Sequence, residues 1–126
     1  MRAIDTNVLV RIIIRDDAQK AEAGDRFVER GAWVSMLALA EASWVLTSVY
    51  ERSAAELAAS IRMLLDHEHV ALQDPDVVEA ALDSFRIRSS LSFSDCLLLE
   101  MAKKAGHLPL GTFDRELSRL KGAEKL

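Results

Sequence analysis

The feature that most constrains the fold is the alternation of short apolar segments with longer helical ones along the whole chain. Short apolar runs predict strands, and their composition suits a sheet that is covered on both faces. Strands separated by helices are expected to pair in parallel, because a parallel connection needs a crossover. We therefore expect an α/β protein: a three-layer α/β/α sandwich with a central, mainly parallel sheet of four to five short strands.

Start and stop signals set the expected elements. Ser35 can cap a helix, residues 53–56 match a capping box, Asp74 and Pro75 together favour a helix start, and Gly31 suits the position just past a helix end. The expected strands are residues 2–5, 32–35, 69–73, 109–113 and 123–126. The expected helices are residues 8–14, 18–30, 37–50, 53–66, 75–88, 92–105 and a short one at 115–120.

Length and composition narrow the class of protein. The 126 residues predict one domain spanning 1–126. A net charge of −4 argues against a protein that binds nucleic acid through an overall positive field, but a local basic rim stays open. The single cysteine, Cys96, lies in an apolar run and is interpreted as a buried structural thiol. With no visible signal peptide or membrane span, we expect a cytoplasmic protein.

Three acidic residues stand out by their place relative to the predicted strands and helices. Asp5 and Asp114 each directly follow a predicted strand, so they project from the same end of the sheet if those strands are neighbours. Each could instead be only a helix cap. Asp95 lies in the first turn of a predicted helix, where a capping box with Ser92 is the alternative interpretation.

A fourth acid, Glu41, lies inside a predicted helix. The positions that share its face are Leu37, Ala38, Trp44 and Val45, which are all apolar. A carboxylate on a face that packs is costly unless something pairs with it, which favours a functional role. The alternative is that this helix is apolar all round and that Glu41 marks its one solvent-facing position.

If the four acids converge, either some of them take up protons or a cation neutralises them. Two carboxylates about 5 Å apart repel by roughly 3 kcal/mol at an effective dielectric near 20. Carboxylate oxygens without His or Cys suit Mg²⁺ or Mn²⁺. Zinc is not expected, since His67, His69 and His107 have no metal-site spacing with cysteines and are interpreted as surface or turn residues.

Four segments resemble the PIN-domain family, particularly the VapC-type toxins of bacterial and archaeal toxin–antitoxin pairs. They are Ala-Ile-Asp-Thr-Asn-Val-Leu-Val at residues 3–10, Glu41 within 39–46, Phe-Ser-Asp-Cys-Leu at 93–97, and Gly-Thr-Phe-Asp at 111–114 with Leu117 following. They occur in the family's order and cover essentially the whole chain. Two departures are Cys96, where the family often has Ala, and a minimal last strand.

The resemblance implies both a fold and a chemistry. It implies a five-stranded parallel sheet and assigns Asp5, Glu41, Asp95 and Asp114 as metal-binding, catalytic acids. It implies a Mg²⁺- or Mn²⁺-dependent endoribonuclease, the toxin of a type II toxin–antitoxin pair. Asn7 and Thr112 match the family's polar companions of that site and are expected to orient a carboxylate or a bound water. Turn chemistry is the alternative for both.

The resemblance also implies partners. These are an RNA substrate, a cognate antitoxin protein and a second copy of the chain in a homodimer, with no membrane. Arginines near the acids in sequence are candidate phosphate contacts, and an ordinary solvated surface is their alternative. They are Arg11, Arg15, Arg86, Arg88 and Arg115.

Other functions stay open at this point. One is a PIN ribonuclease that acts in RNA processing. Another is a PIN module that binds RNA or protein without catalysis. A phosphatase of the haloacid-dehalogenase type is disfavoured, because that class needs a second Asp two positions after the first, and this chain has Asn7 there.

Overall fold

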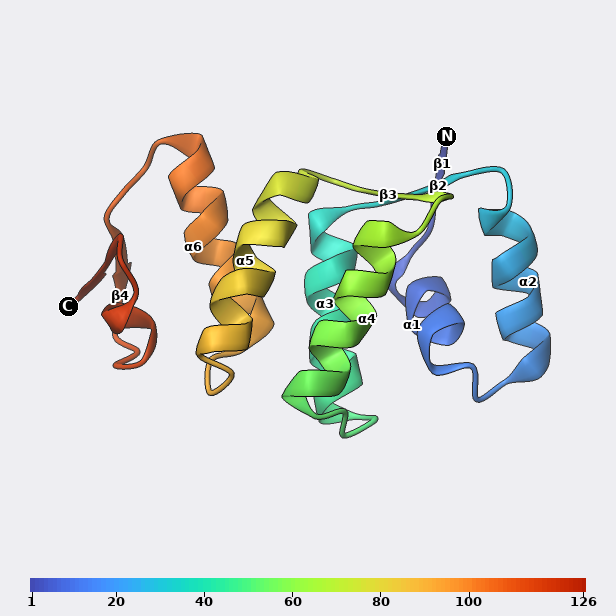
Figure 1. Ribbon diagram of the computed structural model, residues 1–126, viewed down its shortest axis with the longest axis horizontal. Coiled ribbons are helices and arrows are strands. Elements are labelled where there is room, and N and C mark those ends of the chain that lie inside the picture. Colours follow the sequence, from blue (N-terminus) through green and yellow to red (C-terminus); the bar gives the residue numbers. More distant parts are fainter. The chain divides into compact units, whose positions relative to one another are not determined.

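The computed structural model describes all 126 residues and contains six α-helices, five strands and one short 3-10 helix. The chain forms two compact units, Met1–Pro75 (unit 1) and Asp76–Leu126 (unit 2). Each unit has its own parallel sheet (Figure 1). No helix combines the length and the apolar character that a membrane crossing requires.

Unit 1 consists of a three-stranded sheet and four helices. Its elements are β1 (Arg2–Ala3), α1 (Thr6–Ile14), α2 (Ala18–Val28), β2 (Ala32–Val34), α3 (Met36–Ser48), α4 (Ala54–Asp66) and β3 (Val70–Leu72). The strands pair in parallel in the order β1-β2-β3, with Trp33 aligned to Ala3 on one side and to Ala71 on the other. Helix α1 contacts both α2 and α3, and α3 contacts α4 (Figure 1).

Side-chain caps explain where the helices of unit 1 begin. Asp5, Ser35 and Ser53 cap α1, α3 and α4, each accepting a hydrogen bond from the backbone N–H three residues ahead. Glu56 completes the predicted capping box by accepting a hydrogen bond from the backbone N–H of Ser53. Helix α1 begins two residues earlier than predicted because Asp5 itself is the cap.

Helices α1 and α2 approach each other closely at Gly24. A Cβ atom at this position would lie 2.5 Å from Cγ2 of Ile12, so only glycine permits this approach without a shift. The same pair of helices is tied by Arg15, whose guanidinium donates to both carboxylate oxygens of Asp25 at 3.0 and 2.6 Å. The hydrogen bond from Arg15 holds the pKa of Asp25 below its ordinary value.

Unit 2 consists of two long helices followed by a small sheet. Its elements are α5 (Pro75–Ile87, whose first residue closes unit 1), α6 (Phe93–Ala105), β4 (Leu110–Thr112), the 3-10 helix (Leu117–Arg119) and β5 (Ala123–Lys125). Strands β4 and β5 pair in parallel. The rings of Phe85 and Phe93 meet edge to face at 5.8 Å, and Lys104 pairs with Asp76 at 3.0 Å. These two contacts join α5 and α6 at both ends, so the helices run antiparallel.

The predicted α/β class and the parallel pairing are confirmed. All five expected strands form, and they pair within two sheets of three and two strands. Helix α5 begins at Pro75, as the Asp74-Pro75 start signal predicted, and Asp74 before it has a left-handed φ of 45°. The helix expected at 115–120 shortens to the 3-10 turn Leu117–Arg119.

Candidate active site

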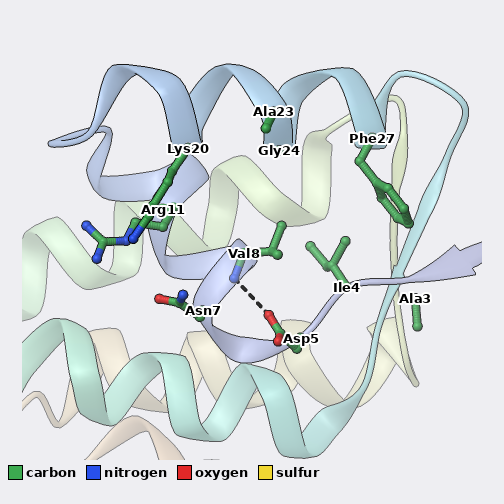
Figure 2. Close-up of a pocket in the computed structure, with 10 residues that line it drawn as sticks. All are labelled: Ala3, Ile4, Asp5, Asn7, Val8, Arg11, Lys20, Ala23, Gly24 and Phe27. Carbon is green, nitrogen blue, oxygen red and sulfur yellow. Dashed lines mark hydrogen bonds between the residues drawn. The ribbon is translucent and has the colours of Figure 1, made fainter.

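Asp5 stands at the point where β1 gives way to α1. Its Oδ1 accepts a hydrogen bond of 2.9 Å from the backbone N–H of Val8, while Oδ2 takes part in no hydrogen bond or ion pair (Figure 2). The side chain is exposed. The cap interpretation of Asp5 is therefore confirmed, and the cap uses only one of the two carboxylate oxygens, leaving the other for a ligand.

Glu41 lies on α3, and a hydrogen bond joins it to the residue that follows Asp5. The hydroxyl of Thr6 donates to Oε2 of Glu41 at 3.1 Å, across 35 positions of sequence. This contact brings Asp5 and Glu41 to the same place in unit 1. Thr6 was not predicted from the sequence. The only signal for it was its position within the motif that spans residues 3 to 10.

The prediction that Glu41 lies on a packed face is wrong. Glu41 is exposed; of the four positions expected to share its face, Leu37 and Trp44 are 69% and 64% exposed, Val45 is half-buried, and only Ala38 is buried. Helix α3 is apolar nearly all round, so periodicity could not show which side packs. The buried side carries Ala38, Leu39, Ala42, Ser43 and Leu46.

The other two acids belong to unit 2. Asp95 lies in the first turn of α6, where its backbone N–H donates to the hydroxyl of Ser92 at 3.1 Å. The reciprocal half of a capping box is absent, so the Asp95 carboxylate has no hydrogen bond or ion pair. Asp114 follows β4, and its Oδ1 accepts a hydrogen bond of 2.9 Å from the backbone N–H of Leu117. As in Asp5, one oxygen serves the backbone and the other is unused.

A long hydrogen bond connects the segments that carry these two acids. The hydroxyl of Ser90, just before α6, donates to Oε2 of Glu116, just after Asp114, at 3.4 Å. Thr112 accepts a 2.9 Å hydrogen bond from the backbone N–H of Asp114, so it fixes the turn that presents that carboxylate. Asn7 is exposed and its side chain makes no hydrogen bond.

The donors fit a hard divalent cation in their chemistry. Asp5 and Glu41 lie in unit 1 and Asp95 and Asp114 in unit 2, and within either unit no group of three or more His, Cys, Asp or Glu side chains could hold a metal. The unused donors are all carboxylate oxygens, which Mg²⁺ and Mn²⁺ prefer. These are Oδ2 of Asp5, Oε1 of Glu41, both oxygens of Asp95 and Oδ2 of Asp114.

Neither the cysteine nor the histidines compete for this role. Burial raises the pKa of the Cys96 thiol to about 11, with the charges of Asp95 and Glu100 adding to the shift. Because a thiolate is the form that binds metal, this side chain is inert, as the sequence predicted. His67 accepts a hydrogen bond from the backbone N–H of His69 at the turn before β3, which confirms a turn role for both.

A pocket of about 600 Å³ opens beside Asp5 in unit 1. Its lining includes Asp5, Asn7, Val8, Arg11, Lys20 and Phe27. Figure 2 shows Arg11 and Lys20 at one end of the pocket and Phe27 at the other. The pocket thus joins an acid, an apolar wall and two cations. Lys20 was missed from the sequence because it lies on α2, and only the packing of α2 against α1 brings it beside the Asp5 motif.

The five arginines proposed as phosphate contacts differ in their surroundings. Arg11 pairs with Asp16 at 3.0 Å. Both terminal nitrogens of the Arg15 guanidinium donate hydrogen bonds to the carboxylate of Asp25. The remaining three make no ion pair. They are Arg86 and Arg115, which are exposed, and Arg88, which is half-buried.

Comparison with known proteins identifies the family. The family model described as PIN domain matches residues 3–123, which is nearly the whole chain and runs through both units. The chain belongs to the PIN domain family. PIN domains are generally nuclease domains and typically depend on a metal, and their α/β/α fold agrees with the elements found here. Neither the search of curated proteins nor that of solved structures found a match to this PIN domain.

Proposed function

We propose that this PIN domain is a Mg²⁺- or Mn²⁺-dependent endoribonuclease and the toxin of a type II toxin–antitoxin pair. One observation carries the nuclease part of the proposal. All four acids at the family's motif positions, Asp5, Glu41, Asp95 and Asp114, keep at least one carboxylate oxygen outside every hydrogen bond and ion pair. These oxygens are therefore available to a ligand at all four motif positions.

The four acids share the work in the proposed site. Asp5 would be the central ligand, Asp95 and Asp114 would complete the set, and Glu41 would bind the cation or position the attacking water. Hydrogen bonds restrain three of these four carboxylates, so little side-chain entropy is lost when a ligand arrives. A cation held by these acids would supply a nucleophile from water near neutral pH and would neutralise charge on the scissile phosphate.

The RNA backbone needs positive charge near an acidic site. The pocket beside Asp5 offers Lys20, whose ammonium makes no ion pair, and the guanidinium of Arg11. The Nε atom of Arg11 is buried without a hydrogen-bond partner. Phosphate contacts of this kind position a nucleic acid without reading its sequence. We therefore place the RNA strand along this pocket.

The toxin role, the antitoxin and the homodimer rest on the resemblance to VapC-type proteins. The exposed side chains Leu37 and Trp44 on α3 support them, because large apolar groups on one exposed helix face favour a protein partner. Light scattering of the purified chain measures the oligomeric state. Co-expression with the product of an adjacent small reading frame tests whether an antitoxin suppresses toxicity.

The decisive experiment on the nuclease proposal compares two aspartates that both cap helices in unit 1. Asp5→Asn keeps the cap acceptor of α1 but removes the carboxylate charge, so RNA cleavage with Mg²⁺ or Mn²⁺ should be abolished while the melting temperature stays close to that of the wild type. Asp17→Asn makes the same change at the cap of α2, where no chemistry is proposed, so it should cleave RNA as the wild type does.

Three results contradict the proposal. Full cleavage in EDTA removes the metal requirement. Full activity of Asp5→Asn removes this acid from the site. Metal binding without cleavage of any RNA favours the alternative of a non-catalytic PIN module.

A further inference from the structure

A single side-chain hydrogen bond connects the start of α1 to the acid on α3. Thr6 is the first helical residue after the cap Asp5, and its hydroxyl donates to Oε2 of Glu41 at 3.1 Å. Thr6 is half-buried, and its β-branched side chain has few rotamers. The hydroxyl is therefore held in place before any ligand binds, because the backbone of α1 and the packing of α1 on α3 both position it.

This bond matters for Glu41 because nothing else holds that side chain. Glu41 is exposed and makes no ion pair, and a free glutamate loses rotamer entropy when it is fixed in one conformation. The hydrogen bond from the Thr6 hydroxyl restrains the Glu41 side chain before a ligand binds. It engages Oε2 and leaves Oε1 available.

The chemical nature of the partner supports a role in function over a role in stability alone. An arginine or lysine beside Glu41 would neutralise the carboxylate and compete with a bound cation. A hydroxyl donor restrains the carboxylate and leaves its negative charge in place. The same turn of α1 also fixes Asp5 through the backbone N–H of Val8, so two adjacent residues orient two acids of the site.

We propose that Thr6 is a positioning residue that holds the Glu41 carboxylate in the orientation that binds the divalent cation. This inference rests on the proposed function and assigns Thr6 a role that neither its position in the helix nor its packing requires. Groups that orient a metal ligand typically change metal affinity or activity by about 10- to 100-fold when they are removed. Thr6 only restrains the Glu41 carboxylate, and the carboxylate itself is still present when Thr6 is replaced. We therefore expect the lower end of that range.

The test compares two substitutions at Thr6 with a matched control on α3. Thr6→Val keeps the shape and removes the hydroxyl, and Thr6→Ser keeps the hydroxyl. Thr47→Val removes a threonine hydroxyl that bonds only to the backbone carbonyls of Ser43 and Trp44. For each full-length variant, calorimetric titration measures Mn²⁺ affinity, and RNA cleavage is followed as a function of Mn²⁺ concentration.

We expect Thr6→Val to bind Mn²⁺ about tenfold more weakly and to need correspondingly more Mn²⁺ for half-maximal cleavage, with an unchanged KM for RNA. Thr6→Ser and Thr47→Val should resemble the wild type. Wild-type Mn²⁺ affinity in Thr6→Val overturns the inference and leaves the nuclease proposal intact. An equal loss in Thr6→Val and Thr6→Ser also overturns it, since the hydroxyl is then not the group that matters. A wild-type chain that neither binds Mn²⁺ nor cleaves RNA overturns both proposals.

Discussion

At the scale of single residues, two carboxylates of the candidate site each accept a backbone hydrogen bond with only one of their two oxygens. Asp5 and Asp114 each accept a backbone hydrogen bond with Oδ1 and keep Oδ2 unused. The bound oxygen fixes the side-chain torsions, so the other oxygen points in a set direction. A helix cap and a metal ligand are thus compatible interpretations of one side chain, although they look like alternatives in the sequence.

The ion pair between Arg15 and Asp25 gives a pH-dependent prediction at the same scale. The hydrogen bond from Arg15 lowers the pKa of Asp25 below the ordinary value of about 3.9. A depressed folded-state pKa contributes stability above the unfolded pKa and loses it as pH falls through the folded one. Asp25→Asn should therefore lower the melting temperature slightly at pH 7, and this difference should shrink to zero as the pH falls well below 4.

Thermal unfolding followed by circular dichroism between pH 2 and pH 7 measures this difference. Glu22→Gln is the control, since Glu22 pairs with Arg26 on the exposed surface of the same helix and connects no second element. A gap between Asp25→Asn and wild type that persists unchanged at pH 2 would show that the effect is not ionic.

At the scale of elements, the contact of α1 with α2 is set by a glycine in the middle of a helix. Gly24→Ala should gain up to about 1 kcal/mol in helix propensity but lose roughly 1–3 kcal/mol through the clash with Ile12, which is buried and β-branched. We expect a net destabilisation of about 1 kcal/mol. Urea unfolding measures it.

The neighbouring residue supplies the control for this prediction. Ala23 is exposed on α2, so Ala23→Gly should report helix propensity alone, a loss of about 1 kcal/mol. If Gly24→Ala is instead more stable than the wild type by a similar amount, the close approach of α1 and α2 does not restrict this position.

Element boundaries were predictable where a side chain closes a local hydrogen bond. Ser35 and the capping box at Ser53 act within four residues, so the sequence contains all the information needed. The exposed face of α3 was not predictable, because the residues around Glu41 are apolar on every side and only tertiary packing chooses between them. The left-handed φ of Asp74 was not predictable either, since a left-handed turn and a helix cap favour the same residue types.

The same distinction explains what could be predicted of the candidate site. The acids were found because three of them stand at ends of strands or helices and because the family's motifs mark all four. Thr6 was missed because its role depends on a contact between α1 and α3, which are distant in sequence. Lys20 was missed because only the packing of α2 against α1 brings it to the pocket beside Asp5. Spacing along a chain reports neighbours within an element and carries no signal for such contacts.

At the scale of the whole molecule, the net charge of −4 means that the proposed RNA binding depends on local positive charge. Lys20→Ala should weaken RNA binding and reduce the slope of log affinity against log salt by roughly one, because one phosphate contact is lost. Fluorescence anisotropy with an RNA oligonucleotide measures the slope in an Asp95→Asn background that does not cleave. Lys121→Ala, an exposed lysine far along the sequence, should leave the slope unchanged. Equal slopes for Lys20→Ala and its background would remove the pocket from the RNA path.

The hydrogen bond from Val8 to Asp5 has a consequence for how this protein can be silenced by mutation. Replacement by alanine removes both the proposed cation ligand and the helix cap, and loss of the cap costs about 1 kcal/mol and reduces the amount of folded protein. Replacement by asparagine or serine keeps the helix cap, so a variant without the proposed activity should still accumulate at normal levels. Inactive variants that persist in cells should therefore carry a hydrogen-bond acceptor at this position.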